Sequence, residues 1–181
     1  DVAVHGGTFY AAGGQAVAVC TQGGCSTELT DASIFQLETA AVDSHGNVWA
    51  SYYSNGGGPS LIVWPGGAMP GRTVRGYVNQ NTPGGLLFDR RDRLISVQTL
   101  FPHVYTYRCD ASTARCRNTG TFGLQGGSLF GALNARNSNF QATDYANDSI
   151  DVYAYPGFTY EYSYDRGLLS GSAVQGIVQT H

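Results

Sequence analysis

Lysine is absent from this sequence, and charged residues of both signs are scarce. Arginine supplies all ten positive charges, charged residues make up 13% of the chain, and the formal net charge is −3. A surface that binds nucleic acid or an anionic membrane needs a basic patch to neutralise phosphates. The charge balance therefore argues against nucleic acid as a partner.

Long apolar runs and helical periodicity are missing as well. No apolar run approaches the roughly 18 residues that span a bilayer, and no segment has a convincing 3.6-residue apolar period. We therefore expect neither membrane insertion nor long helices. The chain begins at Asp1 rather than methionine and shows no signal peptide, so we expect it to be processed or cut from a longer polypeptide.

Glycine and tyrosine are abundant, at 25 and 12 of the 181 residues. Glycine reaches positive φ without a steric clash, which suits tight turns. Aromatic and β-branched residues favour strands. The composition therefore indicates an all-β protein of short strands joined by tight turns.

A repeat of about 46 residues runs through the chain. Each copy begins with an apolar strand, continues through a polar turn of about four residues and returns in an alternating strand. Asp43 and Asp89 hold the same place in two copies, 46 residues apart, and Ala135 holds it in a third. The copies lie at residues 2–11, 41–50, 87–96 and 133–142, and Gly176–Gln179 has the pattern of a fifth.

Two further strands complete each copy. Third strands are expected at 16–19, 61–64, 104–107 and 150–153, and more polar fourth strands at 26–30, 72–76, 118–122 and 160–164. Four strands in each 40–50 residues is typical of a β-propeller blade; a sandwich or barrel with coincidental spacing is the alternative. We predict one propeller domain over residues 1–181, closed on itself or part of a larger propeller. Its blades are expected at about 1–38, 39–84, 85–130 and 131–175, with a further blade starting at 176–181.

Two of the repeats resemble a known family. Val42–Ala50 and Asp144–Tyr153 are similar to the "VDssGNlyVaD…NnrIdVy" repeats of NHL-type, SMP-30-like and YncE-like β-propellers. The resemblance is at the level of the repeat and implies a fold that hosts many functions. SMP-30-type propellers bind a divalent metal in the channel through a glutamate, an asparagine and an aspartate. Here Glu28 and Glu161 fall in outer strands and Glu38 in an expected loop, which argues against lactonase-type activity.

The four cysteines form two close pairs. Cys20 and Cys25, and likewise Cys109 and Cys116, bracket the turn between the third and fourth strands of their repeats. Cysteines across a hairpin can reach disulfide distance, whereas these spacings are poor for a four-cysteine zinc site. We predict both disulfides, and with them an oxidising location: secreted, periplasmic or at the cell surface.

Residues that could carry a reaction are hard to find. The sequence has no nucleophile elbow of a serine hydrolase. Asp43, Asp89 and Asp92 recur in the turn between first and second strands, where an aspartate caps the turn by accepting from backbone N–H groups; calcium binding is the alternative. The histidines share no position in the repeat: His5, His45, His103 and His181. We predict no catalytic residue, no metal and no cofactor.

Tyrosines crowd the last repeat, where Tyr160, Tyr162 and Tyr164 alternate along one outer strand. Because tyrosine is enriched at protein interfaces, we predict an interface there. A sugar-stacking surface is the alternative. A carbohydrate-binding propeller should have tryptophans at equivalent positions of its blades, whereas Trp49 and Trp64 occupy different strands of one blade, so carbohydrate binding is only weakly supported. Asn147 begins a formal glycosylation sequon at a hairpin tip.

Our leading hypothesis is an extracytoplasmic, non-enzymatic scaffold or binding propeller that self-assembles, with itself or another extracellular protein as partner. Low charge, paired cysteines and an incomplete repeat at each end favour it, because unpaired strand edges must be covered. The alternative is a secreted lactonase-like hydrolase with a metal site in the propeller channel.

Overall fold

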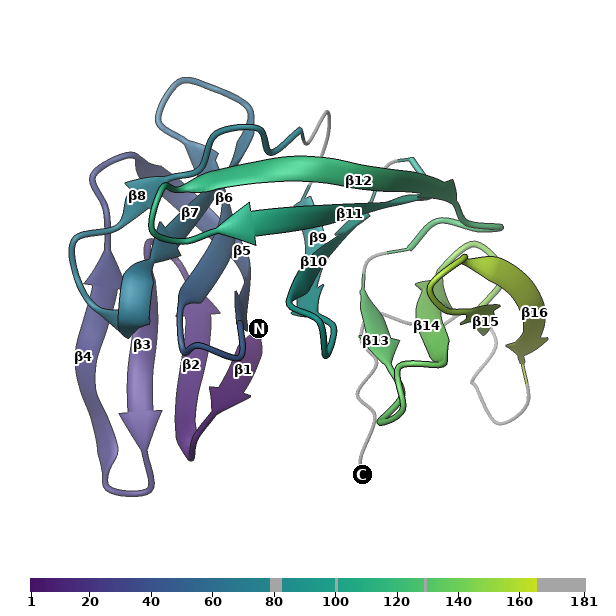
Figure 1. Ribbon diagram of the computed structural model, residues 1–181, viewed down its shortest axis with the longest axis horizontal. Coiled ribbons are helices and arrows are strands. Elements are labelled where there is room, and N and C mark those ends of the chain that lie inside the picture. Colours follow the sequence, from purple (N-terminus) through teal and green to yellow (C-terminus); the bar gives the residue numbers. More distant parts are fainter. Residues whose placement is uncertain (79–82, 100, 129, 166–181) are drawn as a thin grey trace.

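The computed structural model of the chain (Figure 1) describes residues 1–78, 83–99, 101–128 and 130–165. Strands joined by short turns make up its regular structure, apart from the 3₁₀ turn η1 (Pro65–Gly67). Within these residues, no helix combines the length and apolar content needed to cross a membrane. The expected start of a fifth repeat at Gly176–Gln179 lies outside the described residues.

The strands form four antiparallel sheets of four, and we call each sheet a blade. Blade 1 contains β1 (Val2–His5), β2 (Thr8–Gly13), β3 (Ala16–Thr21) and β4 (Gly24–Thr30). Blade 2 contains β5 (Ile34–Val42), β6 (Val48–Ser54), β7 (Pro59–Trp64) and β8 (Arg72–Thr73). Blade 3 contains β9 (Pro83–Phe88), β10 (Arg93–Gln98), β11 (His103–Asp110) and β12 (Arg115–Gly123). Blade 4 contains β13 (Gly131–Leu133), β14 (Asn139–Asp144), β15 (Ser149–Ala154) and β16 (Thr159–Tyr164).

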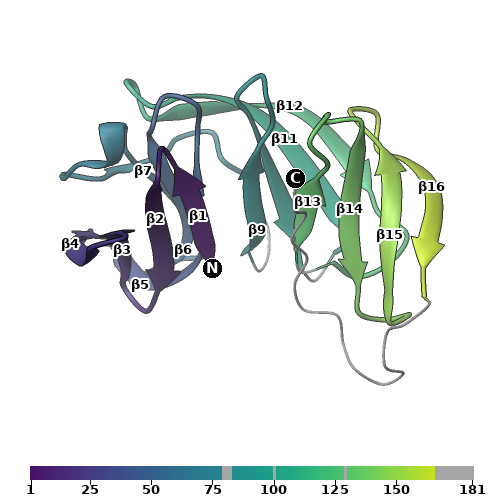
Figure 2. The ribbon, with the colours of Figure 1, turned by 90° about the horizontal axis from the view of Figure 1, so that it is seen from below.

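The blades fan out in an arc around their first strands. Strands β1, β5, β9 and β13 line a common central cavity. The fourth strands β4 and β16 lie at opposite ends of the molecule in both views (Figures 1 and 2). The prediction of an all-β chain of four-stranded blades, with apolar first strands inside, is confirmed.

The apolar core of the described residues is divided into three clusters, one between each pair of consecutive blades. Val17 and Leu29 of blade 1 pack against Trp64 of blade 2. Trp49 of blade 2 packs against Leu94 of blade 3, and further side chains of blades 3 and 4 form the last cluster. Each blade is therefore stabilised mainly by its neighbours. Among the described residues there is no fourth cluster between blades 4 and 1, which a closed four-bladed ring would require.

Strand β5 departs from the sequence-based boundaries. It begins at Ile34, so the expected division between residues 38 and 39 falls inside it. Its pairing with β6 shifts twice, between Ile34 and Gln36 and between Leu37 and Thr39. Each bulge adds a residue and breaks the two-residue alternation from which a strand is recognised. Glu38, expected in a loop, lies in this inner strand.

Candidate functional site

The turn after β5 is built around one carboxylate at the mouth of the central cavity. Asp43 accepts hydrogen bonds from the backbone N–H groups of His45 and Asn47, both at 3.0 Å, and from Nδ2 of Asn47 at 2.8 Å. The buried indole N–H of Trp49 donates to the same carboxylate at 3.0 Å. The expected capping role of Asp43 is confirmed.

Asp89 caps the equivalent turn of blade 3 and also accepts a hydrogen bond from blade 4. It accepts from the backbone N–H groups of Arg91 and Arg93 and pairs with Nε of Arg93 at 2.7 Å. The hydroxyl of Tyr155, at the end of blade 4's third strand, donates to it at 2.7 Å. Burial alone would raise the pKa of Asp89, but the hydrogen bonds from Tyr155 and Arg93 outweigh burial and hold this pKa below its ordinary value.

A repeated contact joins the turns of neighbouring blades. The backbone N–H and the hydroxyl of Ser44 in blade 2 donate to the carboxylate of Asp92 in blade 3, at 2.9 and 2.6 Å. In the amide orientation that satisfies its neighbours, Asn137 of blade 4 accepts from the backbone N–H of Arg90 in blade 3 at 2.7 Å. Asp92 and Asn137 both adopt positive φ. We call these two contacts the rim latches.

The cavity between the first strands has a volume of about 680 Å³. It is lined by apolar side chains of the first strands, among them Ala40, Leu86 and Ala132, and by polar residues at and beyond the strand ends, among them His5 and the latch residue Ser44. A concave site that combines apolar and polar lining groups can hold a small ligand. The carboxylates of Asp43 and Asp89 are engaged by donors of the protein itself, which leaves them poorly placed to coordinate calcium.

Metal-ligating residues do not gather in the described part of the chain. No group of three His, Cys, Asp or Glu side chains there could hold a metal ion. Glu38 lies in an inner strand but does not line the cavity, and it accepts a hydrogen bond from Gln36 at 3.0 Å. His5 lines the cavity mouth and His45 stands 3.6 Å from Asp92, while His181 lies outside the described residues.

Both expected cysteine pairs are bonded. Cys20–Cys25 joins β3 to β4 and Cys109–Cys116 joins β11 to β12, directly across the ladder in each case. The two bridges differ in their surroundings. Cys116 is buried in the cluster between blades 2 and 3, whereas Cys25 is exposed at the hairpin tip.

The three tyrosines of β16 do not share one face. Tyr162 and Tyr164 lie together, with hydroxyls 3.2 Å apart and rings in an edge contact, and they stand opposite Val152 and Ile150. Glu161 of β16 has no partner where the register shifts between Val152 and Tyr153, and this bulge places Tyr160 opposite Tyr153, on the other face. The alternation of the sequence did not reveal this bulge. All three side chains are between 41% and 49% exposed.

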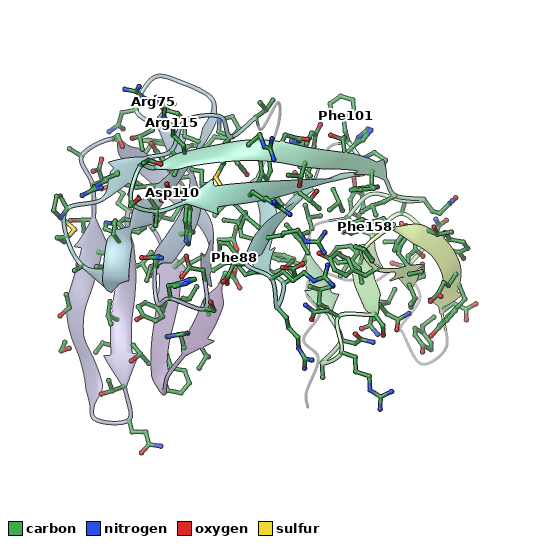
Figure 3. All side chains as sticks on the ribbon, in the orientation of Figure 1. Arg75, Phe88, Phe101, Asp110, Arg115 and Phe158 are labelled. Carbon is green, nitrogen blue, oxygen red and sulfur yellow. A yellow bond between two sulfur atoms is a disulfide. The ribbon has the colours of Figure 1, made fainter. Side chains whose placement is uncertain are left out.

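The two tryptophans are both buried. Trp49 lies between blades 2 and 3, beside Phe88 with ring centroids 5.9 Å apart, and Trp64 lies between blades 1 and 2. Phe88 stands near the middle of the molecule in Figure 3. Both tryptophans therefore contribute to packing between blades. Asn147, the first residue of the glycosylation sequon, is exposed, and its Nδ2 donates a hydrogen bond to the carboxylate of Asp144 at 2.7 Å.

Solved structures share this arrangement. A chain from a nidogen–laminin complex superposes with a TM-score of 0.70 at 15% identity, over 90% of this chain and 62% of its own length. The chain has a β-propeller fold. A Kuenenia stuttgartiensis hydrazine synthase chain gives a TM-score of 0.67 at 10% identity, over 90% of this propeller and 47% of that chain. A Bacteroides caccae protein of unknown function gives 0.65 at 8% identity, over 91% and 60%.

These likenesses establish the fold alone, because all three identities are low. The propeller spans less than two-thirds of the length of each of these structures. No family model and no curated protein matches the sequence.

Proposed function

We propose that this propeller is an extracytoplasmic scaffold that assembles with further copies of itself through the outward faces of blades 1 and 4. One observation carries the proposal: in the part of the chain that the structure describes, four blades share three apolar clusters. In a propeller each blade is sandwiched between two others, and within the described residues one face of blade 1 and one face of blade 4 have no neighbouring blade.

The uncovered face of blade 1 is apolar. Val2 and Val4 are each 60% exposed and Phe9 is 41% exposed. Val4 and Phe9 are cross-strand partners on this face, and the next pair along it is Val2 and Ala11. Such a face is costly in water and suits the apolar face of another blade.

Blade 4 offers an amphipathic surface at the other end of the arc. Tyr162 and Tyr164 combine apolar rings with hydroxyl groups and are about half exposed, which suits an interface that forms and dissociates. Contact between the blade 1 face of one copy and the blade 4 face of the next is heterologous. It therefore produces either a closed ring or a filament.

The two disulfides support an extracytoplasmic location. Disulfides persist in oxidising compartments and are rare where thiols are kept reduced. Both bridges close short hairpins, with sequence separations of 5 and 7 residues.

Light scattering after gel filtration tests the assembly. We expect the non-reduced protein to have a mass that is a multiple of 19.2 kDa and the double variant Val4→Glu/Phe9→Glu to be a monomer. Phe101→Glu is the matched control, because Phe101 is 52% exposed and lies far from the blade 1 face (Figure 3). A monomer of unchanged protein at high concentration would contradict self-assembly and direct attention to a ligand of the central cavity.

A further inference from the structure

Positive charge is concentrated in one blade of an acidic protein. Residues 83–123, which form blade 3, contain six of the ten arginines and only three of the thirteen acidic residues. This segment therefore carries a charge of +3 within a chain of −3. Positive charge therefore gathers in blade 3 although the chain as a whole is acidic.

Three of these arginines stand in one row across the sheet. Arg93 of β10 is the direct partner of Arg108 in β11, and Arg108 is the direct partner of Arg117 in β12. Directly opposed residues project from the same face of a sheet. Like charges in this position destabilise a sheet, so the row costs folding free energy in the absence of an anion.

Only the first arginine of the row is neutralised. Arg93 pairs with Asp89 at 2.7 Å and stacks over the ring of Tyr155 at 5.3 Å. Arg108 and Arg117 are exposed, and neither forms an ion pair with any residue that the structure describes. Two positive charges of the row therefore remain uncompensated.

A groove of about 480 Å³ lies against this row, between the face of blade 3 and the hairpin that contains Pro156 of blade 4. The arginines share it with Thr106, Asn118 and Thr119. These residues add hydroxyl and amide donors, and the residues lining the groove include no carboxylate. A second hollow of about 350 Å³ shares Arg93 and Arg108 with the groove.

We propose that this arginine groove binds a tetrahedral oxyanion, sulfate or phosphate, either as the free ion or as an ester on a larger ligand. Guanidinium groups bind such anions through paired N–H···O bonds. A divalent anion matches the two uncompensated charges, whereas a single carboxylate would leave one unpaired. The bound anion would also remove the repulsion between Arg108 and Arg117, so binding and stability are coupled.

Calorimetric titration with sodium sulfate and sodium phosphate, at ionic strength held constant with sodium chloride, tests the site. We expect saturable binding of both anions, accompanied by a rise in Tm that chloride and acetate do not produce. Arg108→Ala and Arg117→Ala should each weaken binding at least tenfold, because each removes a charged donor pair. Arg136→Ala is the control: Arg136 is exposed on a turn of blade 4, does not line the groove, and its loss changes net charge equally.

A second readout separates binding from folding. In chloride alone at low ionic strength, Arg108→Ala should match or exceed the Tm of the unchanged protein, because the opposed charges are relieved. In sulfate the order should reverse. Absence of saturable binding, or binding that survives both substitutions, would overturn the proposal.

The same titration with a sulfated oligosaccharide distinguishes the two sources of the anion. Binding at least tenfold tighter than inorganic sulfate, and lost in Arg117→Ala, would assign the site to an ester on a larger ligand. Equal affinity would assign it to the free ion. This result is independent of assembly, because the groove does not include the outward faces of blades 1 and 4.

Discussion

At the scale of single residues, one acceptor side chain organises the turn after the first strand in three of the blades. Asp43, Asp89 and Asn134 accept from the backbone N–H groups of their own turns. Blade 1 solves the same problem differently, since Gly6 and Gly7 both adopt positive φ in a two-residue hairpin turn. A side-chain acceptor, carboxylate or amide, is present only where the turn is longer.

Replacing Asp43 tests the importance of this acceptor. Asp43→Ala leaves two backbone N–H groups and the buried indole N–H of Trp49 without their partner. We expect a loss of about 3 kcal/mol in the free energy of unfolding, measured by urea denaturation. Asp43→Asn should also destabilise, because its NH₂ group would meet donors from Asn47 or Trp49. Asp110→Ala, on an exposed outer hairpin, should have a smaller effect; equal losses would refute the special role of Asp43.

The lowered pKa of Asp89 predicts a dependence of stability on acid. The folded-state pKa lies below the unfolded value of about 3.9. Above pH 3.9 both states are ionised and the stabilisation is fully present. Below it the unfolded state takes up the proton first, so stability falls as the pH drops through the folded pKa. Tyr155→Phe removes one bond to the carboxylate, and urea denaturation between pH 6 and pH 3 should then show a shallower decline; an unchanged slope would exclude the contribution of Tyr155.

At the scale of strands and turns, the sequence predicted the existence of the blades better than the exact boundaries and bulges of their strands. The repeat of Asp43 and Asp89 located two first turns, because a buried acceptor leaves a recognisable pattern. The bulges at Glu38 and Glu161 could not be recognised from the sequence, since an inserted residue mimics a loop or a regular strand. The arginine groove was also missed: net charge averages over the chain, and the opposition of Arg108 and Arg117 depends on pairing register, which composition does not contain.

Removing the two disulfides should destabilise the protein to different extents. The chain-entropy model assigns each short loop about 2 kcal/mol. Cys116 is also buried between blades 2 and 3, whereas the Cys20–Cys25 hairpin projects from the end of the arc. We therefore expect Cys109→Ser/Cys116→Ser to lower Tm more than Cys20→Ser/Cys25→Ser, in thermal scans monitored by circular dichroism. Equal losses would show that the bridges act only through the unfolded chain.

At the scale of the whole molecule, the arc behaves as a row of blades in which each unit draws its stability from its neighbours. Among the residues described, blades 2 and 3 each pack against two others, while blades 1 and 4 each share a single apolar cluster. Nearest-neighbour energetics of this kind let the end units open at lower free energy than the interior ones. The same end units carry the faces that we assign to assembly.

Amide hydrogen exchange measures both the lower stability of the end blades and their protection by assembly. At low protein concentration, we expect amides of β2–β3 and β14–β15 to exchange faster than those of β6–β7 and β10–β11. Raising the concentration should protect blades 1 and 4 selectively, because assembly supplies each with its second neighbour. Val4→Glu/Phe9→Glu should abolish that gain while leaving the interior blades unchanged. If protection of the end blades is independent of concentration and already equals that of the interior, the outward faces are not docking surfaces and the arc is stable as a monomer.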